Sequence, residues 1–256
     1  MNDDLVPRPS LALLGIEPVR ALLEYVHHHL STGDHAEGDG HAVVLFPGLG
    51  ADERLMAPLA RHCERLGYEC FDWGRGRNAG PDGDAAAWIG ELGDEIDART
   101  AHNDNGVTLI GWSLGGFYAR EIAKARSDRV RQVITLGCPF AQVGDSTNVG
   151  WLFELLNGAS ATVSARYARE LRAPPPLPTT SIYSRSDGVV AWQACRVKPG
   201  PIAENVEVES SHLGLVWHPE VLRVIADRLA QPRGGWRPWK ESASMREGAW
   251  AEGAAA

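Results

Sequence analysis

The residues best suited to chemistry are a serine framed by glycines, in the motif Gly111-Trp112-Ser113-Leu114-Gly115. An apolar run, Val107 to Gly111, enters this motif, and a stretch of helical character leaves it toward Ala125. A sharp strand-to-helix turn strains the backbone at the serine and leaves no room for side chains at its two ends, which glycine relieves. The helix amino terminus beneath the serine favours developing negative charge. We therefore predict that Ser113 is a nucleophile, the alternative being a serine that only caps the helix.

On this motif and its context, the chain resembles the α/β-hydrolase superfamily, in particular its bacterial esterase and lipase-like members. The resemblance covers His41 to Leu229. It implies an α/β-hydrolase fold, with a mostly parallel central sheet flanked by helices and a small cap or lid insertion. It also implies a catalytic triad that follows the chain order serine, acid, histidine.

The acid of such a triad belongs in a loop just after a late strand. Asp187 matches, because the segment from Ser184 to Val190 follows the predicted strand at 179–183. We expect the adjacent Gly188 to let this loop bend tightly. Two alternatives remain open: Asp187 only organises a turn, as Asp-Gly pairs often do, or the acid is Asp145, which follows the preceding strand.

The histidine should follow the last strand. His212, in Ser210-Ser211-His212-Leu213-Gly214, comes directly after the predicted strand at 205–209, so the resemblance implies that it is the base. His218 is the alternative, although its place just before Pro219 favours a helix-capping role. His62 and His102 lie outside the required order.

The oxyanion hole implied by the resemblance consists of two backbone N–H groups. One belongs to Leu114, the residue after the nucleophile. The other belongs to Leu49, in Pro47-Gly48-Leu49-Gly50, where relatives often carry His-Gly-x-Gly. Pro47 in place of the histidine is a departure from the family pattern, but the donor is a main-chain group, so the hole is still expected.

Short β-rich runs alternate with helical stretches from His41 onward, which is typical of a parallel sheet with crossover helices. Strands are expected at residues 42–46, 68–72, 107–111, 130–136, 179–183 and 205–209. Helices are expected at residues 54–66, at 84–99, from the serine motif to about 125, and at 220–229, with Pro219 favourable at the start of the last. Residues 41–140 and 179–230 thus form the two parts of the hydrolase core.

The segment between these two parts, residues 141–178, breaks the strand–helix rhythm. It ends in Pro174-Pro175-Pro176-Leu177-Pro178, which cannot be a central strand or a helix interior. We interpret it as a cap or lid over the sheet edge. Its apolar Trp151 and Phe153 either line an acyl pocket or form the core of the cap, and Trp112, beside the nucleophile, is the third candidate for substrate binding.

Two further features lie near the predicted site. The loop from Asp72 to Pro81 carries Arg75 and Arg77, which could contact an anionic group of the substrate. In the alternative that we favour, Arg77 and Asn78 tie the loop down. Cys138 lies just past the strand at 130–136. A catalytic thiol is not expected there, because the serine, acid and histidine of a triad all have candidates.

The ends of the chain look like additions to the core. Residues 1–40 are predicted as an appendage with an amphipathic helix within Ile16 to Leu30, followed by a polar linker from Ser31 to Gly40. The apolar positions of this helix are Val19, Leu22, Leu23, Val26 and Leu30. The consecutive His27, His28 and His29 point in different directions on a helix, so no metal site is expected there. Residues 231–256 are predicted as a mostly disordered tail, in which Trp236, Trp239 and Trp250 could dock locally or on a partner.

Composition narrows the classes of function. The 256 residues suffice for one α/β domain, and the net charge of −8 without a dense Lys/Arg stripe gives nucleic-acid binding no electrostatic basis. The acidic start Met1-Asn2-Asp3-Asp4 and the lack of an apolar run of about 18 residues predict neither an export signal nor a membrane span, hence a cytoplasmic protein. The spacings of the four cysteines fit neither zinc nor a disulfide framework, so reduced thiols are expected at Cys63, Cys70, Cys138 and Cys195. Oligomeric state stays open.

The expected function is therefore that of a cofactor-free serine hydrolase cleaving carboxylic esters of small to medium apolar acyl groups, with a small ester or lipid-like molecule as substrate. A thioesterase, an amidase or an acyltransferase would use the same triad. A hypothesis from another class is a non-catalytic binding protein on the same scaffold.

Overall fold

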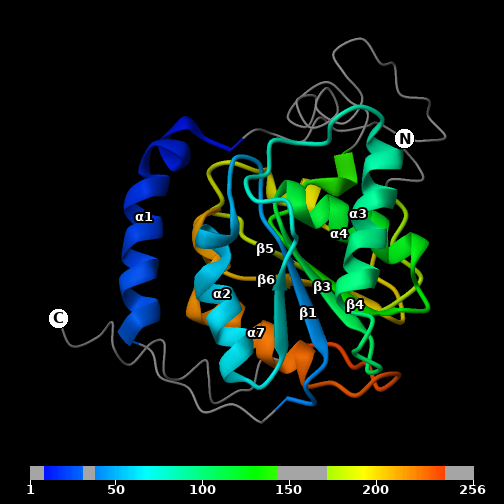
Figure 1. Ribbon diagram of the computed structural model, residues 1–256. Coiled ribbons are helices and arrows are strands. Elements are labelled where there is room, and N and C mark those ends of the chain that lie inside the picture. The colour runs from blue at the N-terminus through cyan, green and yellow to red at the C-terminus, as the bar shows by residue number, and fades with distance from the viewer. Residues whose placement is uncertain (1–8, 31–37, 143–171, 240–256) are drawn as a thin grey trace.

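In the part of the chain that the structure describes, a sheet of six parallel strands, in the order β2-β1-β3-β4-β5-β6, forms the centre of the computed structural model (Figure 1). The structure describes residues 9–30, 38–142 and 172–239. Its strands are β1 (Ala42–Phe46), β2 (Glu69–Asp72), β3 (Val107–Trp112), β4 (Val130–Leu136), β5 (Thr179–Tyr183) and β6 (Ala203–Glu207). Its α-helices are α1 (Leu11–Leu30), α2 (Glu53–Arg65), α3 (Ala85–Arg99), α4 (Leu114–Ala125) and α7 (Pro219–Leu229). Short 3₁₀ turns are η1 (Phe140–Gln142), η2 (Trp192–Cys195) and η3 (Gly214–Val216).

The predicted mostly parallel sheet with flanking helices is confirmed, and most predicted strands begin and end within one residue of the observed ones. The last strand differs, because β6 begins at Ala203 and not at Asn205. Its pairing with β5 begins at Thr179 and Ala203. The start of β6 is polar, since the Glu204 carboxylate accepts hydrogen bonds from Thr180 and Arg228, and this polar character hides the strand in the sequence.

Two apolar cores cover the two faces of the sheet. Successive side chains of a strand point to opposite faces, so Val44 and Phe46 of β1 pack in one core while Val43 and Leu45 pack in the other. The first core contains side chains of α3 and α4, and the second contains side chains of α2 and α7. Figure 1 shows these helix pairs on opposite sides of the strands. All five residues of β1 are buried, which explains its unbroken apolar run.

The strand order creates a switch point between β1 and β3. The chain leaves β1 toward β2 on one side and returns to β3 on the other. In open parallel sheets the crevice at the carboxyl ends of two such strands is the usual place for a ligand. Ser113 follows β3 and the turn at 47–50 follows β1, so both lie at this crevice.

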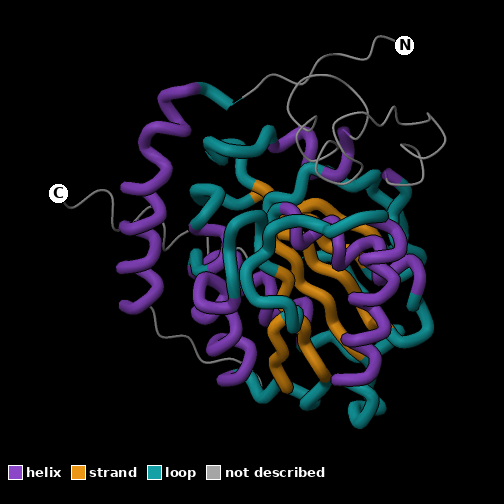
Figure 2. Tube along the Cα trace, turned by 45° about the horizontal axis from the view of Figure 1, so that its top comes forward, coloured by secondary structure: helices purple, strands orange, loops and turns teal. Residues whose placement is uncertain are grey.

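Helix α1 starts five residues before the predicted Ile16, because Ser10 caps it: the Ser10 hydroxyl accepts a hydrogen bond from the Leu13 N–H at 3.2 Å. Figure 2 shows α1 at the edge of the molecule, separated from the strands by loops. Four of the predicted apolar positions of α1 are turned toward solvent, since Val19, Leu22 and Leu23 are each more than 60% exposed and Val26 is also exposed. The polar linker predicted after it lies outside the described residues up to residue 37.

The predicted tail is described as far as residue 239, and in this part Trp239 docks locally on the core, which is one of the two possibilities considered for the tail tryptophans. The Arg237 carbonyl accepts a hydrogen bond from Arg228 of α7, and the Trp239 N–H donates to Glu204 of β6. The Trp239 ring packs against the second core. Trp250 and most of the predicted cap, residues 143–171, lie outside the described residues. None of the described helices combines the length and the apolar character that a membrane span requires.

Candidate active site

Ser113 lies in a strained backbone conformation at the turn from β3 into α4. Its φ of 53° and ψ of −123° fall in a region that side chains disfavour, and it is the only non-glycine residue with positive φ among the described residues. Such strain persists only where the surrounding structure imposes it, and it is concentrated at functional sites. The Ser113 side chain does not cap α4. The capping alternative for this serine therefore has no contact to support it.

The glycines of the motif are required by close packing of backbone. A Cβ at Gly111 would overlap the Gly115 backbone, as predicted. A Cβ at Gly115 would instead overlap the carbonyl of Phe46 at the end of β1. The second glycine therefore lets α4 begin directly against β1, which places the start of the helix at the switch point.

Asp187 and His212 form a buried hydrogen-bonded pair. Oδ2 of Asp187 lies 2.7 Å from Nδ1 of His212, and the two residues are 3% and 5% exposed. The other carboxylate oxygen, Oδ1, accepts hydrogen bonds from the N–H groups of Val189 and Val190 at 2.8 and 2.7 Å. One carboxylate thus organises its own turn and also contacts the histidine, so the two interpretations of Asp187 do not exclude each other.

The backbone of His212 is held at both its N–H and its carbonyl. The N–H donates to the Glu17 carboxylate of α1 at 3.0 Å. The carbonyl accepts a hydrogen bond of 2.9 Å from the indole N–H of Trp112, whose ring centre lies 5.3 Å from that of the imidazole. Trp112 itself is buried in the second core. These contacts give Trp112 a role in holding His212, and its predicted role in binding substrate stays a prediction.

Ser113 and His212 share two neighbours. Trp112 precedes the serine and contacts the histidine. The Ser113 N–H donates to the Leu136 carbonyl at the end of β4 at 2.8 Å, and the next residue, Gly137, lies so close to the imidazole that a Cβ there would be 3.1 Å from its Nδ1. The φ of Gly137 is also positive, at 56°. The ends of β3 and β4 thus bring the serine and the histidine to the same part of the sheet edge.

The surroundings of His212 favour its protonated form. Burial lowers its pKa, but the Asp187 charge, the hydrogen bond to Asp187 and the Glu17 charge raise it, so the pKa lies above its ordinary value of 6.5. A histidine tuned in this way accepts a proton more readily, which is what a general base requires.

The turn after β1 is fixed over the serine. A Cβ at Gly48 would lie 3.1 Å from the Ser113 Cβ, so the backbone of this turn passes directly beside the nucleophile. The buried Asn78 holds the turn, because its Nδ2 donates to the Pro47 carbonyl at 2.7 Å and its carbonyl accepts the Gly50 N–H at 2.7 Å. Leu49 lies between these two anchors, and Leu114 is the first residue of α4, where helix N–H groups have no partner within the helix. Of the two predicted oxyanion donors, Leu114 is thus next to Ser113 in the chain, and Leu49 belongs to the turn that passes beside Ser113.

The two arginines of the loop after β2 have structural partners. Arg75 forms a two-bond ion pair with Glu95 of α3, with distances of 3.0 and 2.7 Å, and lies over the Trp88 ring. Arg77 donates to the Gly50 carbonyl at 3.0 Å. The interpretation that this loop is tied down is the one that these contacts support.

The alternative histidines are engaged elsewhere. His218 caps α7, because its Nδ1 accepts the Glu220 N–H at 3.3 Å, as its place before Pro219 predicted. His62 contacts the Leu222 carbonyl, and His102 pairs with Glu69. The alternative acid Asp145 lies outside the described residues, as do Trp151 and Phe153.

The cysteines are free thiols, as predicted. Burial raises the pKa of Cys138 to about 12, so its nucleophilic thiolate is suppressed. Among the described residues, no three His, Cys, Asp or Glu side chains are grouped closely enough to hold a metal ion. That the chemistry needs no cofactor stays a prediction.

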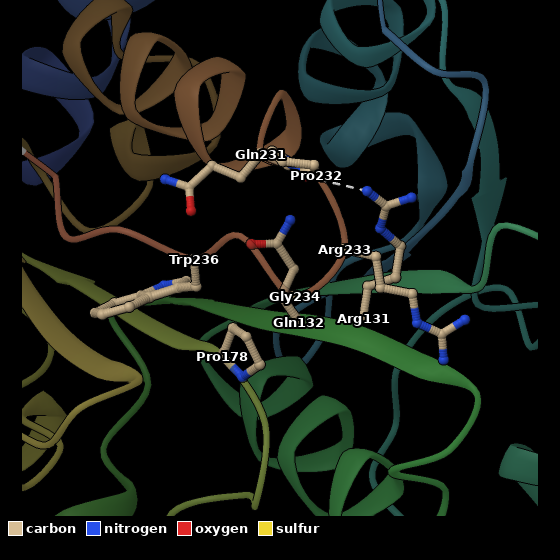
Figure 3. A pocket seen from close by; sticks show the side chains of 8 residues that line it. All are labelled: Arg131, Gln132, Pro178, Gln231, Pro232, Arg233, Gly234 and Trp236. Atoms are coloured by element: carbon tan, nitrogen blue, oxygen red, sulfur yellow. Dashed lines mark hydrogen bonds between the residues drawn. The ribbon is translucent and has the colours of Figure 1, made fainter.

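A small pocket lies at the opposite end of the sheet (Figure 3). Arg131 and Gln132 at the start of β4 and Pro178 just before β5 line it, together with Trp236. These residues are at the amino ends of their strands, whereas Ser113, Asp187 and His212 follow carboxyl ends. The pocket is therefore separate from the candidate site.

Three charged residues of α1 that were not predicted from the sequence reach this site. Glu17, Arg20 and Glu24 contact the loops that carry Asp187 and His212. The one available signal was the spacing of these charges, which places them on one face of a mostly apolar helix. A charged face on an amphipathic helix ordinarily indicates a solvated surface, so the sequence alone favours the opposite orientation.

The fold described above is that of an alpha/beta hydrolase. Residues 43–251 match the alpha/beta hydrolase family. The chain belongs to this family, in agreement with the resemblance seen in the sequence.

Two characterised relatives match part of the chain. The human protein named serine hydrolase BPHL is 32% identical over 116 residues, which are 43% of this chain and 38% of that protein. The pimeloyl-[acyl-carrier protein] methyl ester esterase of Shewanella woodyi is 29% identical over 110 residues, 42% of this chain and 40% of that protein. The matched region thus spans about two fifths of the length of each relative.

Solved structures share the fold. A Bacillus licheniformis lipase in its mature form superposes with a TM-score of 0.56 at 16% identity, covering 78% of this chain and 96% of that one. A Paleococcus ferrophilus monoacylglycerol lipase gives 0.53 at 16% identity, covering 77% and 96%. These likenesses show that the chain shares the fold of the two lipases.

Proposed function

We propose that this chain is a serine ester hydrolase in which Ser113, His212 and Asp187 act as a catalytic triad. The observation that carries the proposal is the buried 2.7 Å contact of Asp187 with His212 at the sheet edge where Ser113 occupies its strained turn. The serine hydrolase and the methyl ester esterase among the relatives support the same class of reaction.

The roles follow from the contacts. Because Nδ1 of His212 is bonded to Asp187, Nε2 is the nitrogen that receives the Ser113 proton as the hydroxyl oxygen attacks the acyl carbon. Asp187 stabilises the imidazolium that forms. The N–H groups of Leu49 and Leu114 donate hydrogen bonds to the tetrahedral oxyanion.

The ester bond then breaks, and the leaving alcohol takes the proton from His212. Water attacks the acyl-enzyme with His212 again accepting a proton, which releases the carboxylic acid and returns Ser113 to its hydroxyl form. No step requires a group from outside the chain other than water.

The substrate class that we propose is a carboxylic ester with a small to medium apolar acyl group. The apolar residues of the predicted cap, Trp151 and Phe153, motivate this preference. Thioester, amide and acyl-transfer chemistry use the same triad and are outcomes of the test below.

A substrate panel tests the proposal. Wild type and Ser113→Ala are compared on nitrophenyl esters of increasing acyl length, on acyl-CoA thioesters and on anilides. We expect ester hydrolysis that falls about 10⁴- to 10⁶-fold in Ser113→Ala, whereas Cys138→Ala retains it. Activity restricted to thioesters or amides, or equal ester activity in wild type and Ser113→Ala, would reject the ester assignment.

A further inference from the structure

Helix α1 turns its polar side toward the protein and its apolar side outward. Glu17 is 6% exposed and Ala21 is 3% exposed, whereas Val19, Leu22 and Leu23 on the other side are 61%, 62% and 65% exposed. A helix that docks only for packing buries its apolar stripe. The reversed orientation of α1 indicates that its polar contacts determine how it docks.

Glu17 joins the two loops that carry the acid and the base. Its Oε1 accepts the N–H of Gly188, the residue after Asp187, at 2.7 Å. The N–H of His212 donates to both oxygens of the same carboxylate, at 3.0 and 3.2 Å. A single buried side chain therefore connects residues next to both members of the Asp187–His212 pair.

Neighbouring charges of α1 hold the same two loops. Arg20 donates to the carbonyl of Ser186 and, at 2.8 Å, to its hydroxyl, which places it on the other side of Asp187. Glu24 accepts the Ser211 N–H at 2.8 Å and the Ser211 hydroxyl at 2.5 Å, just before His212. The three side chains of α1 thus bracket both functional residues.

Two glycines make this close approach possible. A Cβ at Gly188 would lie 2.7 Å from the Leu13 backbone and 2.8 Å from the Glu17 side chain, and a Cβ at Gly214 would overlap the Glu24 carboxylate. Neither glycine has a positive φ. Gly188 is therefore required for the contact with α1, in place of the tight loop bend that the sequence suggested.

We propose that Glu17 is a positioning residue of the candidate triad, holding the Asp187 loop and the His212 loop in register through their backbone N–H groups. This inference rests on the proposed function of Ser113, His212 and Asp187. It extends the site to a helix that precedes the residues matched to the hydrolase family, which begin at residue 43.

The Glu17 charge affects the pKa of His212, which the pH dependence of activity can report. The charged groups acting on the His212 imidazole are Asp187 from the loop after β5 and Glu17 from α1, and both raise its pKa. Arg20 lies 4.0 Å from Glu17 and 3.9 Å from Glu24, and completes the inward charges of α1. Removing the Glu17 charge lowers the pKa of His212, so the acid limb of activity moves to lower pH.

Glu17→Gln removes this charge and retains most of the hydrogen bonds. An amide oxygen in place of Oε1 still accepts from the N–H groups of Gly188 and His212, and only the bond from the His212 N–H to Oε2 is lost. We expect the acid limb of kcat/KM on a nitrophenyl ester to shift down by about half a unit to one unit. Glu91→Gln, on the exposed face of α3, should leave the limb in place.

Glu17→Ala removes the bonds as well. We expect kcat per titrated active site to fall about 10- to 100-fold with KM nearly unchanged, because the base is misplaced while the substrate surface is intact. Gly188→Ala, which displaces α1 sterically and alters no charge, should lower kcat in the same way, and Val19→Ala, on the outer side of α1, should not.

The outcomes separate the two proposals. An acid limb unmoved in Glu17→Gln, or a kcat per active site in Glu17→Ala equal to that of wild type, overturns the role of Glu17 while wild type remains an esterase. Absence of Ser113-dependent activity in wild type instead overturns the proposed function.

Discussion

The Asp187 carboxylate has two roles, one in its own turn and one in the contact with His212. Its Oδ1 closes a local turn with Val189 and Val190, and its Oδ2 is left to contact His212. The turn fixes the direction of Oδ2, so the local and the long-range roles depend on each other.

We expect Asp187→Asn to lower kcat/KM for ester hydrolysis by about 10⁴-fold with the turn preserved. The Asn oxygen still accepts from Val189 and Val190, but the amide nitrogen cannot accept the Nδ1 proton of His212, so the imidazole takes the wrong tautomer. The melting temperature should stay close to that of wild type, whereas kcat falls. Asp145→Asn is the matched comparison: a large loss there, with Asp187→Asn fully active, would assign the acid to Asp145.

That Ser113, Asp187 and His212 lie at one sheet edge could be predicted, because each comes after a predicted strand and parallel strands align their carboxyl ends. Glu17 could not be predicted, since it precedes His212 by 195 residues and lies on a helix that shares no strand pattern with the core. The requirement for glycine at position 188 could not be predicted either, because it comes from the close approach of α1, which is a tertiary contact.

At the scale of elements, the parallel sheet sets the site by aligning the carboxyl ends of its strands. The turn after β1 and the start of α4 converge because Gly115 lets α4 begin against Phe46. Strand boundaries were predictable where both faces are buried, as in β1 and β4. The boundaries of β6 were harder to predict, because this strand mixes buried and exposed positions.

The cap of α7 has a pH dependence of its own. Burial, helped by the charges of His27 and Arg223, lowers the pKa of His218 to about 4 from 6.5. Between these two values the unfolded chain binds a proton that the folded chain does not, so stability rises with pH and is lost as the pH falls from 6.5 toward 4.

We expect His218→Asn to remove this loss, because asparagine caps a helix without titrating. The free energy of unfolding is measured with urea at pH 7 and at pH 4.5. Its fall between these two pH values should be about 1–2 kcal/mol larger in wild type than in His218→Asn. Identical acid sensitivity of the two proteins would show that His218 is not the responsible group.

At the scale of the whole molecule, two kinds of contact hold the site together. The apolar cores on both faces of the sheet fix the strands, and the polar face of α1 fixes two of the loops at their ends. The parallel sheet and the family could be predicted from the strand–helix rhythm and the serine motif. The place of α1 could not, because large apolar residues such as Leu22 and Leu23 are exposed while Glu17 is buried, contrary to the usual pattern.

The most direct test of the account is fluorophosphonate labelling of the folded wild-type chain, with the modified residue located by peptide mass spectrometry. The account predicts one label per chain on Ser113, none in Ser113→Ala, and labelling slowed at least about 10²-fold in His212→Ala because the general base is gone. A folded wild-type protein that stays unlabelled, or that carries its label on another residue such as Ser210, would contradict it.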